Sequence, residues 1–350
     1  MNGNVNISGF ITDQTSYGLV TLNIIKELSK SLDINVYSEG HSNISSEIQF
    51  KEIINKLLHK PINKFSDTLL INHAYNMHKC IGRGDQIGLT FFELNKFTDN
   101  EKASLECLDT LIVTSEWAKN ICESNLSVNV EKCPIGVDRE IFNEVDYKPD
   151  VCRFITIGKW EKRKNQRLIF ESFKKIFKND KKYELTMLFD SPFLSRSKYD
   201  AFKKEFTTEN TRVIDRTNSL SNIAKLLQQS FCFISHSRAE GWNMPLLEAM
   251  SCGKFCISPN YSGESEFVTP KNCSITDVLG LETAKDGVWF GVNELMNNGE
   301  WAILCNNSLC NNIKKIADEY NSDSILNKEG INTAKKFNWQ NTAKTIKGLI

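Results

Sequence analysis

The stretch from Phe231 to Gly253 most constrains how this chain can fold. It begins with an apolar strand pattern at Phe231–Ser235, continues through a polar loop that contains Gly241, and ends in a helical pattern that starts near Pro245. Proline suits the first turn of a helix because its φ is already close to the helical value, and Gly253 suits the C-terminal cap. The stretch therefore predicts a strand–loop–helix unit of an α/β fold.

Two carboxylates, Glu240 and Glu248, flank the predicted turn. The N-terminus of a helix that follows a strand favours phosphate, because its N–H groups and its dipole are positive. Carboxylates repel phosphate but accept hydrogen bonds from sugar hydroxyls. The combination predicts a ligand that is part phosphate and part sugar, such as a sugar nucleotide. The alternative is an ordinary strand–loop–helix unit with surface glutamates.

Strand and helix patterns alternate along the whole chain, which predicts parallel sheets covered by helices. We expect two Rossmann-like domains, at residues 1–147 and 148–335, and a C-terminal helix at 336–350 that packs back toward the first domain. Ligands of such sheets bind outside the carboxyl ends of the strands, so we expect the site in a cleft between the domains. The predicted strands are Val5–Ile11, Ile34–Tyr37, Thr68–Asn72, Gln86–Phe91, Thr110–Thr114, Phe154–Gly158, Glu184–Phe189, Phe231–Ser235 and Phe255–Ser258.

Composition excludes several classes of protein. Lys and Arg together equal Asp and Glu at 43 each, so no basic field indicates nucleic acid as a partner. The 11 cysteines are scattered among apolar strands, which is typical of reduced thiols in a cytoplasmic protein. No pair of Cys or His motifs has zinc spacing, so we expect no metal. A signal peptide and a membrane-spanning run are not expected either.

The residues from Glu240 to Gly253 resemble the donor-site signature of retaining GT-B glycosyltransferases of the family 4, or group 1, type. Three further segments strengthen the resemblance, and the N-terminal third of the chain matches more weakly. The resemblance implies an acceptor-binding N-terminal domain and a nucleotide-sugar-binding C-terminal domain that face one another across a cleft. The three segments are Thr114–Lys119 with Pro134–Asp138, Ile157–Asn165, and Ser258–Val268.

Lys159 and Lys164 align with the basic residues that bind the donor's diphosphate in this family. Lys159 departs from the family, because arginine is usual there and lysine lacks the bidentate fork. Without a metal, fixed cations and backbone N–H groups must stabilise the leaving diphosphate. The alternative interpretation of Lys162–Lys164 is a solvated basic turn.

The resemblance also implies roles for the two carboxylates. Glu248 accepts from the ribose hydroxyls of the nucleotide, and Glu240 contacts the transferred sugar at the bond that breaks. The departing phosphate receives the acceptor's proton on the same face, which retains the configuration of the sugar. The remaining donor-binding residues implied are Gly18, Gly241, Asn243, Met244, Pro245, Leu246, Ile214 and Arg216.

Two residues of the N-terminal half are candidates for the acceptor side. His73 follows a predicted strand, and its alternative role is that of a hydrogen-bonded structural histidine. Glu93 follows the next strand in Thr-Phe-Phe-Glu, which resembles a subgroup with glutamate in place of the usual histidine. We therefore expect Glu93 to act beside Glu240, Lys164 and Lys159 in catalysis, with an exposed strand-end glutamate as the alternative.

The sequence thus predicts a metal-independent retaining glycosyltransferase that moves a hexose-type sugar to a hydroxyl of a glycan or lipid-linked acceptor. The co-substrate is a UDP-, GDP- or ADP-sugar, which the sequence does not separate. Alternatives are a GT-B sugar-nucleotide epimerase, a phosphorylase, or an inactive sugar-nucleotide-binding module. Peripheral membrane contact through the mildly basic helix near Leu19–Leu32 is left open, as is the oligomeric state.

Overall fold

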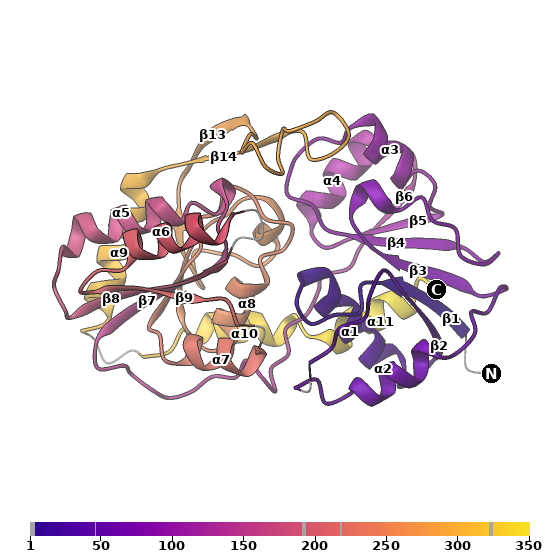
Figure 1. The fold of residues 1–350 in the computed structure, drawn as a ribbon, viewed down its shortest axis with the longest axis horizontal. Coiled ribbons are helices and arrows are strands. Elements are labelled where there is room, and N and C mark those ends of the chain that lie inside the picture. The colour runs from indigo at the N-terminus through magenta and orange to yellow at the C-terminus, as the bar shows by residue number, and fades with distance from the viewer. Residues whose placement is uncertain (1–3, 46, 191–193, 218, 322–324) are drawn as a thin grey trace. The chain divides into compact units, whose positions relative to one another are not determined.

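The computed structural model describes residues 4–45, 47–190, 194–217, 219–321 and 325–350. The chain forms two compact units (Figure 1). Unit 1 contains Met1–Gly136, Asn293–Gly299 and Phe337–Ile350, and unit 2 contains Val137–Val292 and Glu300–Lys336. The boundary predicted at residues 147 and 148 falls inside unit 2, and the segment 293–299, expected in the second domain, belongs to unit 1.

Unit 1 is built on a six-stranded sheet with the order β2-β1-β3-β4-β5-β6. All neighbouring strands in it are parallel. Consecutive residues of the inner strands are buried on both faces of the sheet, and apolar side chains such as Leu70, Leu111 and Val113 belong to the core of the unit. The strands are β1 (Asn4–Gly9), β2 (Asp33–Ser38), β3 (Asp67–Ile71), β4 (Gln86–Thr90), β5 (Thr110–Val113) and β6 (Asn129–Lys132).

Several helices of unit 1 begin at polar residues whose side chains cap the first turn. Thr98 and Glu101 form a reciprocal capping box at the start of α3, and the Ser115 side chain caps α4 by accepting from the Ala118 N–H. The last helix, α11, packs against α1 within this unit. The helices are α1 (Ser16–Leu28), α2 (Lys51–Leu58), η1 (Ala74–Asn76), α3 (Asp99–Leu105), α4 (Glu116–Asn125) and α11 (Trp339–Lys347).

Unit 2 contains a second six-stranded sheet, with the order β12-β11-β10-β7-β8-β9. Its strands are also parallel, so their carboxyl ends lie at one edge. Phe154, Phe173 and Phe206 are fully buried in its core. The strands are β7 (Cys152–Lys159), β8 (Tyr183–Asp190), β9 (Thr211–Asp215), β10 (Cys232–Ile234), β11 (Phe255–Pro259) and β12 (Ser274–Thr276).

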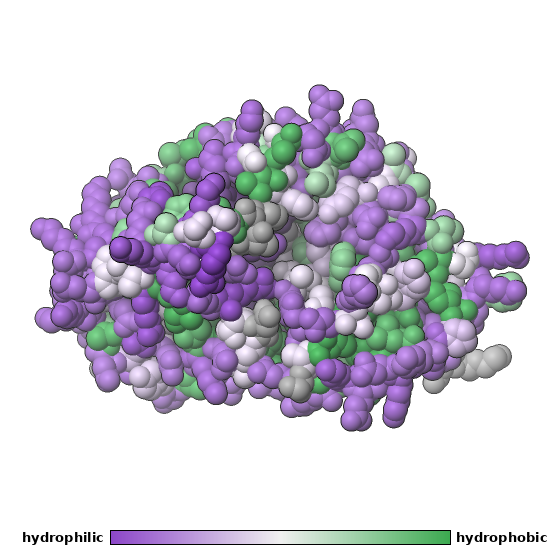
Figure 2. Space-filling model, in the orientation of Figure 1, coloured by the Kyte–Doolittle hydropathy of each residue, from purple (hydrophilic) through white to green (hydrophobic). Residues whose placement is uncertain are grey.

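A two-stranded antiparallel hairpin of β13 (Val278–Thr283) and β14 (Glu300–Leu304) follows β12, and the sequence patterns did not indicate it. Hydrophilic side chains cover much of the surface in Figure 2, with smaller apolar areas among them. The helices of unit 2 are η2 (Lys162–Lys164), α5 (Gln166–Phe177), α6 (Arg196–Phe206), α7 (Leu220–Gln228), α8 (Met244–Ser251), η3 (Ser262–Glu266), α9 (Asn306–Glu319) and α10 (Lys328–Lys336).

The predicted α/β class with two Rossmann-like sheets is confirmed by this architecture. All 11 cysteines are free thiols. Among the described residues, no helix has both the length and the apolar character needed to cross a membrane.

Candidate active site

The loop between β10 and α8 forms the centre of the candidate site. Asn243 adopts a left-handed conformation (φ 72°) directly before α8, and Pro245 lies in the first turn of that helix. Asparagine tolerates this conformation better than most residues. The Asn243 side chain donates to Ser235 Oγ at 2.9 Å and to the carboxylate of Glu264. These bonds hold the start of α8 against the end of β10.

Glu240 is 5% exposed and forms two ion pairs. Its Oε1 lies 2.6 Å from Lys164 Nζ, and its Oε2 lies 2.9 Å from Arg163 Nη1. Burial alone raises the pKa of this carboxyl, but the charges of Arg163 and Lys164 outweigh burial and lower the pKa to about 2. Glu240 is therefore a carboxylate at neutral pH.

Arg163 is a site residue that sequence reasoning missed. It is 6% exposed, donates from Nη1 to the carbonyl of Ala239 at 2.6 Å, and pairs through Nη2 with Glu161 at 3.0 Å. The sequence placed Arg163 in a basic turn, and no local pattern shows that it points inward. Its guanidinium fixes the backbone directly before Glu240.

Lys164 reaches Glu240 from the loop that follows β7. A side chain at Gly158 would come within 3.2 Å of Lys164 Cε, so the glycine leaves room for the lysine stem. Asn165, at φ 55°, turns the chain into α5. Lys159 ends β7 with an exposed side chain and forms no part of the Glu240 cluster.

The η3 loop supports Glu240 from the other side. Ser262 Oγ accepts from the Glu240 N–H at 2.7 Å, and the Gly263 N–H donates to the Glu240 carbonyl at 2.8 Å. A Cβ at Gly263 would lie 2.1 Å from the Gly241 carbonyl oxygen, so the two loops can pack this closely only with glycine there.

Glu248 lies in α8 and is 8% exposed. Burial raises the pKa of its carboxyl to about 8. None of the described residues forms a side-chain hydrogen bond or ion pair with it. Glu248 therefore has acceptor capacity that the protein leaves unused, in contrast to Glu240.

Five other residues that we predicted to bind the donor belong to unit 2, and they differ in how far they are buried. Leu246 is fully buried, whereas Met244 and Pro245 are half-buried in the first turn of α8. Ile214 is half-buried in β9, and Arg216 is exposed directly after that strand.

Gly18, His73 and Glu93 belong to unit 1. We expected the helix to begin near Leu19, but Gly18 already lies in the first turn of α1, because the Thr15 side chain caps the helix by accepting from the Gly18 N–H. A Cβ there would lie 2.0 Å from the Thr12 carbonyl oxygen. His73 and Glu93 follow β3 and β4, and both are half-buried.

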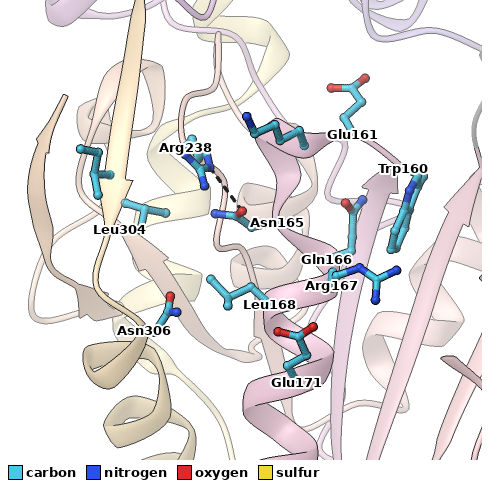
Figure 3. Close-up of a pocket in the computed structure, with 12 residues that line it drawn as sticks. Trp160, Glu161, Asn165, Gln166, Arg167, Leu168, Glu171, Arg238, Leu304 and Asn306 are labelled. Atoms are coloured by element: carbon cyan, nitrogen blue, oxygen red, sulfur yellow. Dashed lines mark hydrogen bonds between the residues drawn. The ribbon is translucent and has the colours of Figure 1, made fainter. Parts of the chain in front are cut away.

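A separate cavity of about 510 Å³ in unit 2 lies between the start of α5 and β14 (Figure 3). Trp160, Asn165, Arg167 and Arg238 are among its lining residues, and Arg238 Nε donates to Asn165 Oδ1 at 3.3 Å. The cavity does not include Lys164, Glu240 or Glu248. Within the described ranges, no three His, Cys, Asp or Glu side chains are grouped as a metal site would require.

The two parallel sheets and the loop cluster around Glu240 define a protein of the GT-B glycosyltransferase class. The family model described as "Glycosyl transferases group 1" matches residues 137–320, which is more than half of the chain. The chain therefore belongs to the group 1 glycosyltransferases and is an enzyme of that family. A search of curated protein sequences gives no match.

Solved structures share the fold over nearly the whole chain. Sucrose-phosphate synthase from Thermosynechococcus elongatus is 13% identical, with a TM-score of 0.71, and the match covers 99% of this chain and 98% of that one. HepE from Anabaena, solved in complex with UDP, is 11% identical, with a TM-score of 0.70 and 99% of each chain covered. A glycosyltransferase from Rickettsia africae is 12% identical, with a TM-score of 0.69 and coverage of 99% and 97%.

Proposed function

We propose that this enzyme transfers a hexose-type sugar, with retention of configuration and without a metal, from a nucleotide sugar to a hydroxyl acceptor. The observation that carries the proposal is the cluster of Arg163, Lys164 and Glu240 beside the start of α8. It combines cations suited to a diphosphate with a carboxylate suited to sugar hydroxyls.

The diphosphate binds near Lys164, with Lys159 at the end of β7 as a second cation. The N–H groups at the start of α8 add positive potential, because the first turn of a helix leaves its N–H groups without intrahelical partners. As the glycosidic bond breaks, negative charge grows on the diphosphate. Preorganised cations stabilise that charge more in the transition state than in the ground state.

Glu240 and Glu248 bind the two sugar rings of the donor. Glu240 is ionised and accepts from hydroxyls of the transferred sugar, with Gly241 and Asn243 beside it. Glu248 accepts from the ribose, because its carboxyl has no protein partner among the described residues. The base lies near Ile214 and Arg216, where main-chain groups of the β9 end hold it.

In the transfer step, the bond between the sugar's anomeric carbon and the diphosphate oxygen breaks. A bond to the acceptor oxygen forms on the same face, and the acceptor's proton passes to the departing phosphate. Glu93 and His73 of unit 1 orient the acceptor hydroxyl. No covalent sugar–enzyme intermediate is required.

The similarity to HepE, whose structure contains UDP, makes UDP the first nucleotide to test. The 11 free cysteines support a reducing, cytoplasmic location. The acceptor is a glycan or a lipid-linked sugar, and the latter would bring the enzyme to a membrane surface.

A thermal-shift screen against UDP-, GDP- and ADP-sugars tests the donor class. A ligand at 100 times its Kd adds about 2.7 kcal/mol to the free energy of unfolding. Product analysis then separates the alternatives: a transferase releases nucleoside diphosphate, an epimerase returns an isomeric donor, and a phosphorylase needs inorganic phosphate. An inert module binds without turnover. Absence of any nucleotide-sugar response would refute the proposal.

A further inference from the structure

Glu264 is a buried carboxyl group of η3 that lies beside the Glu240 cluster. Its exposed fraction is 0%, and it forms no ion pair with any described residue. Burial and the neighbouring Glu240 carboxylate outweigh the opposing effects of Asn243 and Lys164, and they hold the pKa of Glu264 well above its ordinary value of 4.5. Glu264 is therefore a neutral acid at neutral pH, whereas Glu240 is ionised.

The loops around Glu264 contain backbone in the left-handed region. Among the described residues, five other than glycine have a positive φ, and three of them follow neighbouring strands of the unit 2 sheet. They are Asn165 after β7, Asn243 after β10 and Ser262 after β11, with φ values of 55°, 72° and 56°. Such backbone costs free energy and persists where surrounding contacts determine it, most often at functional sites.

The Asn243 side chain holds its own left-handed backbone through acceptors on two neighbouring segments. Its amide donates to Ser235 Oγ, directly after β10, at 2.9 Å and to Glu264 Oε2 in η3. The Asn243 carbonyl in turn accepts from the Leu246 N–H at 3.1 Å, which begins the first turn of α8. The orientation of Asn243 therefore sets the direction of the N–H groups in that turn.

The backbone of η3 fixes Glu264 as an acceptor. The Glu264 carbonyl accepts from the Val268 N–H at 3.0 Å. Two residues before Glu264, Ser262 Oγ accepts from the Glu240 N–H at 2.7 Å. Glu264 thus joins η3 to the loop before α8 at Asn243, at a second point besides the bond between Ser262 and Glu240.

We propose that Glu264 is a positioning residue for sugar transfer, which acts through Asn243 to orient the first turn of α8 toward the donor's diphosphate. The inference rests on the proposed function, which assigns the diphosphate to that turn. N–H groups stabilise a leaving diphosphate only when they are aimed at the charge that develops on it. A small misplacement of such groups costs turnover, so loss of Glu264 lowers kcat more than it weakens binding of the nucleoside diphosphate.

Four variants of the full chain test this role. Glu264→Gln matches the neutral acid in shape and charge and still offers an oxygen to Asn243. Glu264→Met fills a similar volume without that oxygen. Asn243→Gly keeps the left-handed backbone and removes the side-chain amide. Glu209→Met is the matched control, because it makes the same exchange at a side chain that is 61% exposed.

The measurements are kcat with the donor identified in the thermal-shift screen and calorimetric affinity for its free nucleoside diphosphate. Glu264→Met should lower kcat by about tenfold or more and lower the affinity by less than about threefold. Glu264→Gln and Glu209→Met should each stay within about threefold of wild type in kcat. When Asn243→Gly is already present, Glu264→Met should cost less than about threefold in kcat, because the bond that it removes is already lost.

Wild-type kcat in Glu264→Met would overturn the proposal, as would an equal loss in Glu264→Gln. An undiminished loss from Glu264→Met in the Asn243→Gly background would show that Glu264 acts by another route. If Glu264→Met does not fold, Asn243→Gly tests the same bond from its other end, and wild-type kcat there would also overturn the proposal. Failure of the proposed function is distinguishable, because it appears as absent nucleotide-sugar turnover in the wild-type enzyme itself.

Discussion

Lys164 Nζ lies 2.6 Å from Glu240 Oε1, so the cation proposed for the donor's diphosphate and the carboxylate proposed for its sugar are paired with each other. Arg163 holds the second oxygen of the same carboxylate at 2.9 Å. Lys164 can therefore turn toward a phosphate without leaving Glu240 as an unpaired buried charge.

Replacement of Lys164 by alanine should lower turnover by more than about tenfold, because it removes an electrostatic contact to the leaving diphosphate. Steady-state kinetics with the donor identified in the thermal-shift screen measures the loss. Lys162→Ala is the control, because Lys162 is exposed and donates to the Lys285 carbonyl. Wild-type turnover in Lys164→Ala would show that Lys164 is only a structural partner of Glu240.

Replacement of Arg163 by alanine should destabilise the protein by roughly 3–5 kcal/mol, because it removes a partner from two buried carboxylates, Glu161 and Glu240. Urea unfolding followed by circular dichroism measures the change. Arg167→Ala removes an exposed pair with Glu205 and should cost less than about 1 kcal/mol. Equal effects of the two substitutions would contradict a buried structural role for Arg163.

Glu248 should make the free energy of unfolding depend on pH. The pKa of its carboxyl is about 8 in the folded protein against an ordinary value of 4.5, so the folded state binds the proton more tightly. The stabilisation by this proton is complete below pH 4.5 and is lost as the pH rises toward 8. Glu248→Gln has no such proton, so its stability relative to wild type should increase between pH 5 and pH 8. Urea unfolding at pH 5 and pH 8 measures the free energy of unfolding of both proteins. An equal pH dependence in wild type and Glu248→Gln would rule out the raised pKa of Glu248.

Substitutions of Glu240 and Glu248 should have different effects on ligand binding and on turnover. Glu248→Gln should weaken both free nucleoside diphosphate and nucleotide sugar, each charged hydrogen bond being worth roughly 1.5–3 kcal/mol. Wild-type binding should also release protons near pH 7, because ribose hydroxyls favour the ionised Glu248 carboxyl. Glu240→Gln should leave nucleoside diphosphate affinity nearly unchanged and depress turnover. Calorimetric titration measures the two affinities, and titration in buffers of different ionisation enthalpy measures the released protons. If Glu240→Gln lost nucleoside diphosphate affinity while Glu248→Gln kept it, the two roles would be reversed.

Activity should survive EDTA. The sequence has no D-x-D pair at a predicted strand end, and in the proposed function Lys164 supplies the positive charge that a divalent ion would otherwise bring to the diphosphate. The assay compares initial rates before and after chelation, and again after Mn²⁺ or Mg²⁺ is added. Loss on chelation with recovery on metal addition would contradict the metal-free mechanism.

Local patterns predicted much of unit 2 and of the donor loop. The run from Phe231 to Gly253 predicted a strand, a loop and a helix beginning near Pro245, and β10 and α8 have these positions. By contrast, the hairpin of β13 and β14 was missed, because a short antiparallel pair leaves little periodicity in sequence. The predicted helix began near Leu19, whereas α1 begins at Ser16, because the Thr15 side chain caps the helix before Gly18.

The sequence by itself determined the α/β class, the family and the spacing of Glu240 and Glu248, because these depend on residue order along one strand and one helix. Only the tertiary structure decided the state of each carboxylate. Glu240 is ionised because Arg163 and Lys164 reach it from 77 and 76 residues earlier in the chain, while Glu248 is buried with no side-chain partner among the described residues. The ring contacts of Tyr17 with His73 and Phe91 likewise depend on β1, β3 and β4 being neighbours. Charge and ring contacts act through space, so no local pattern can encode them.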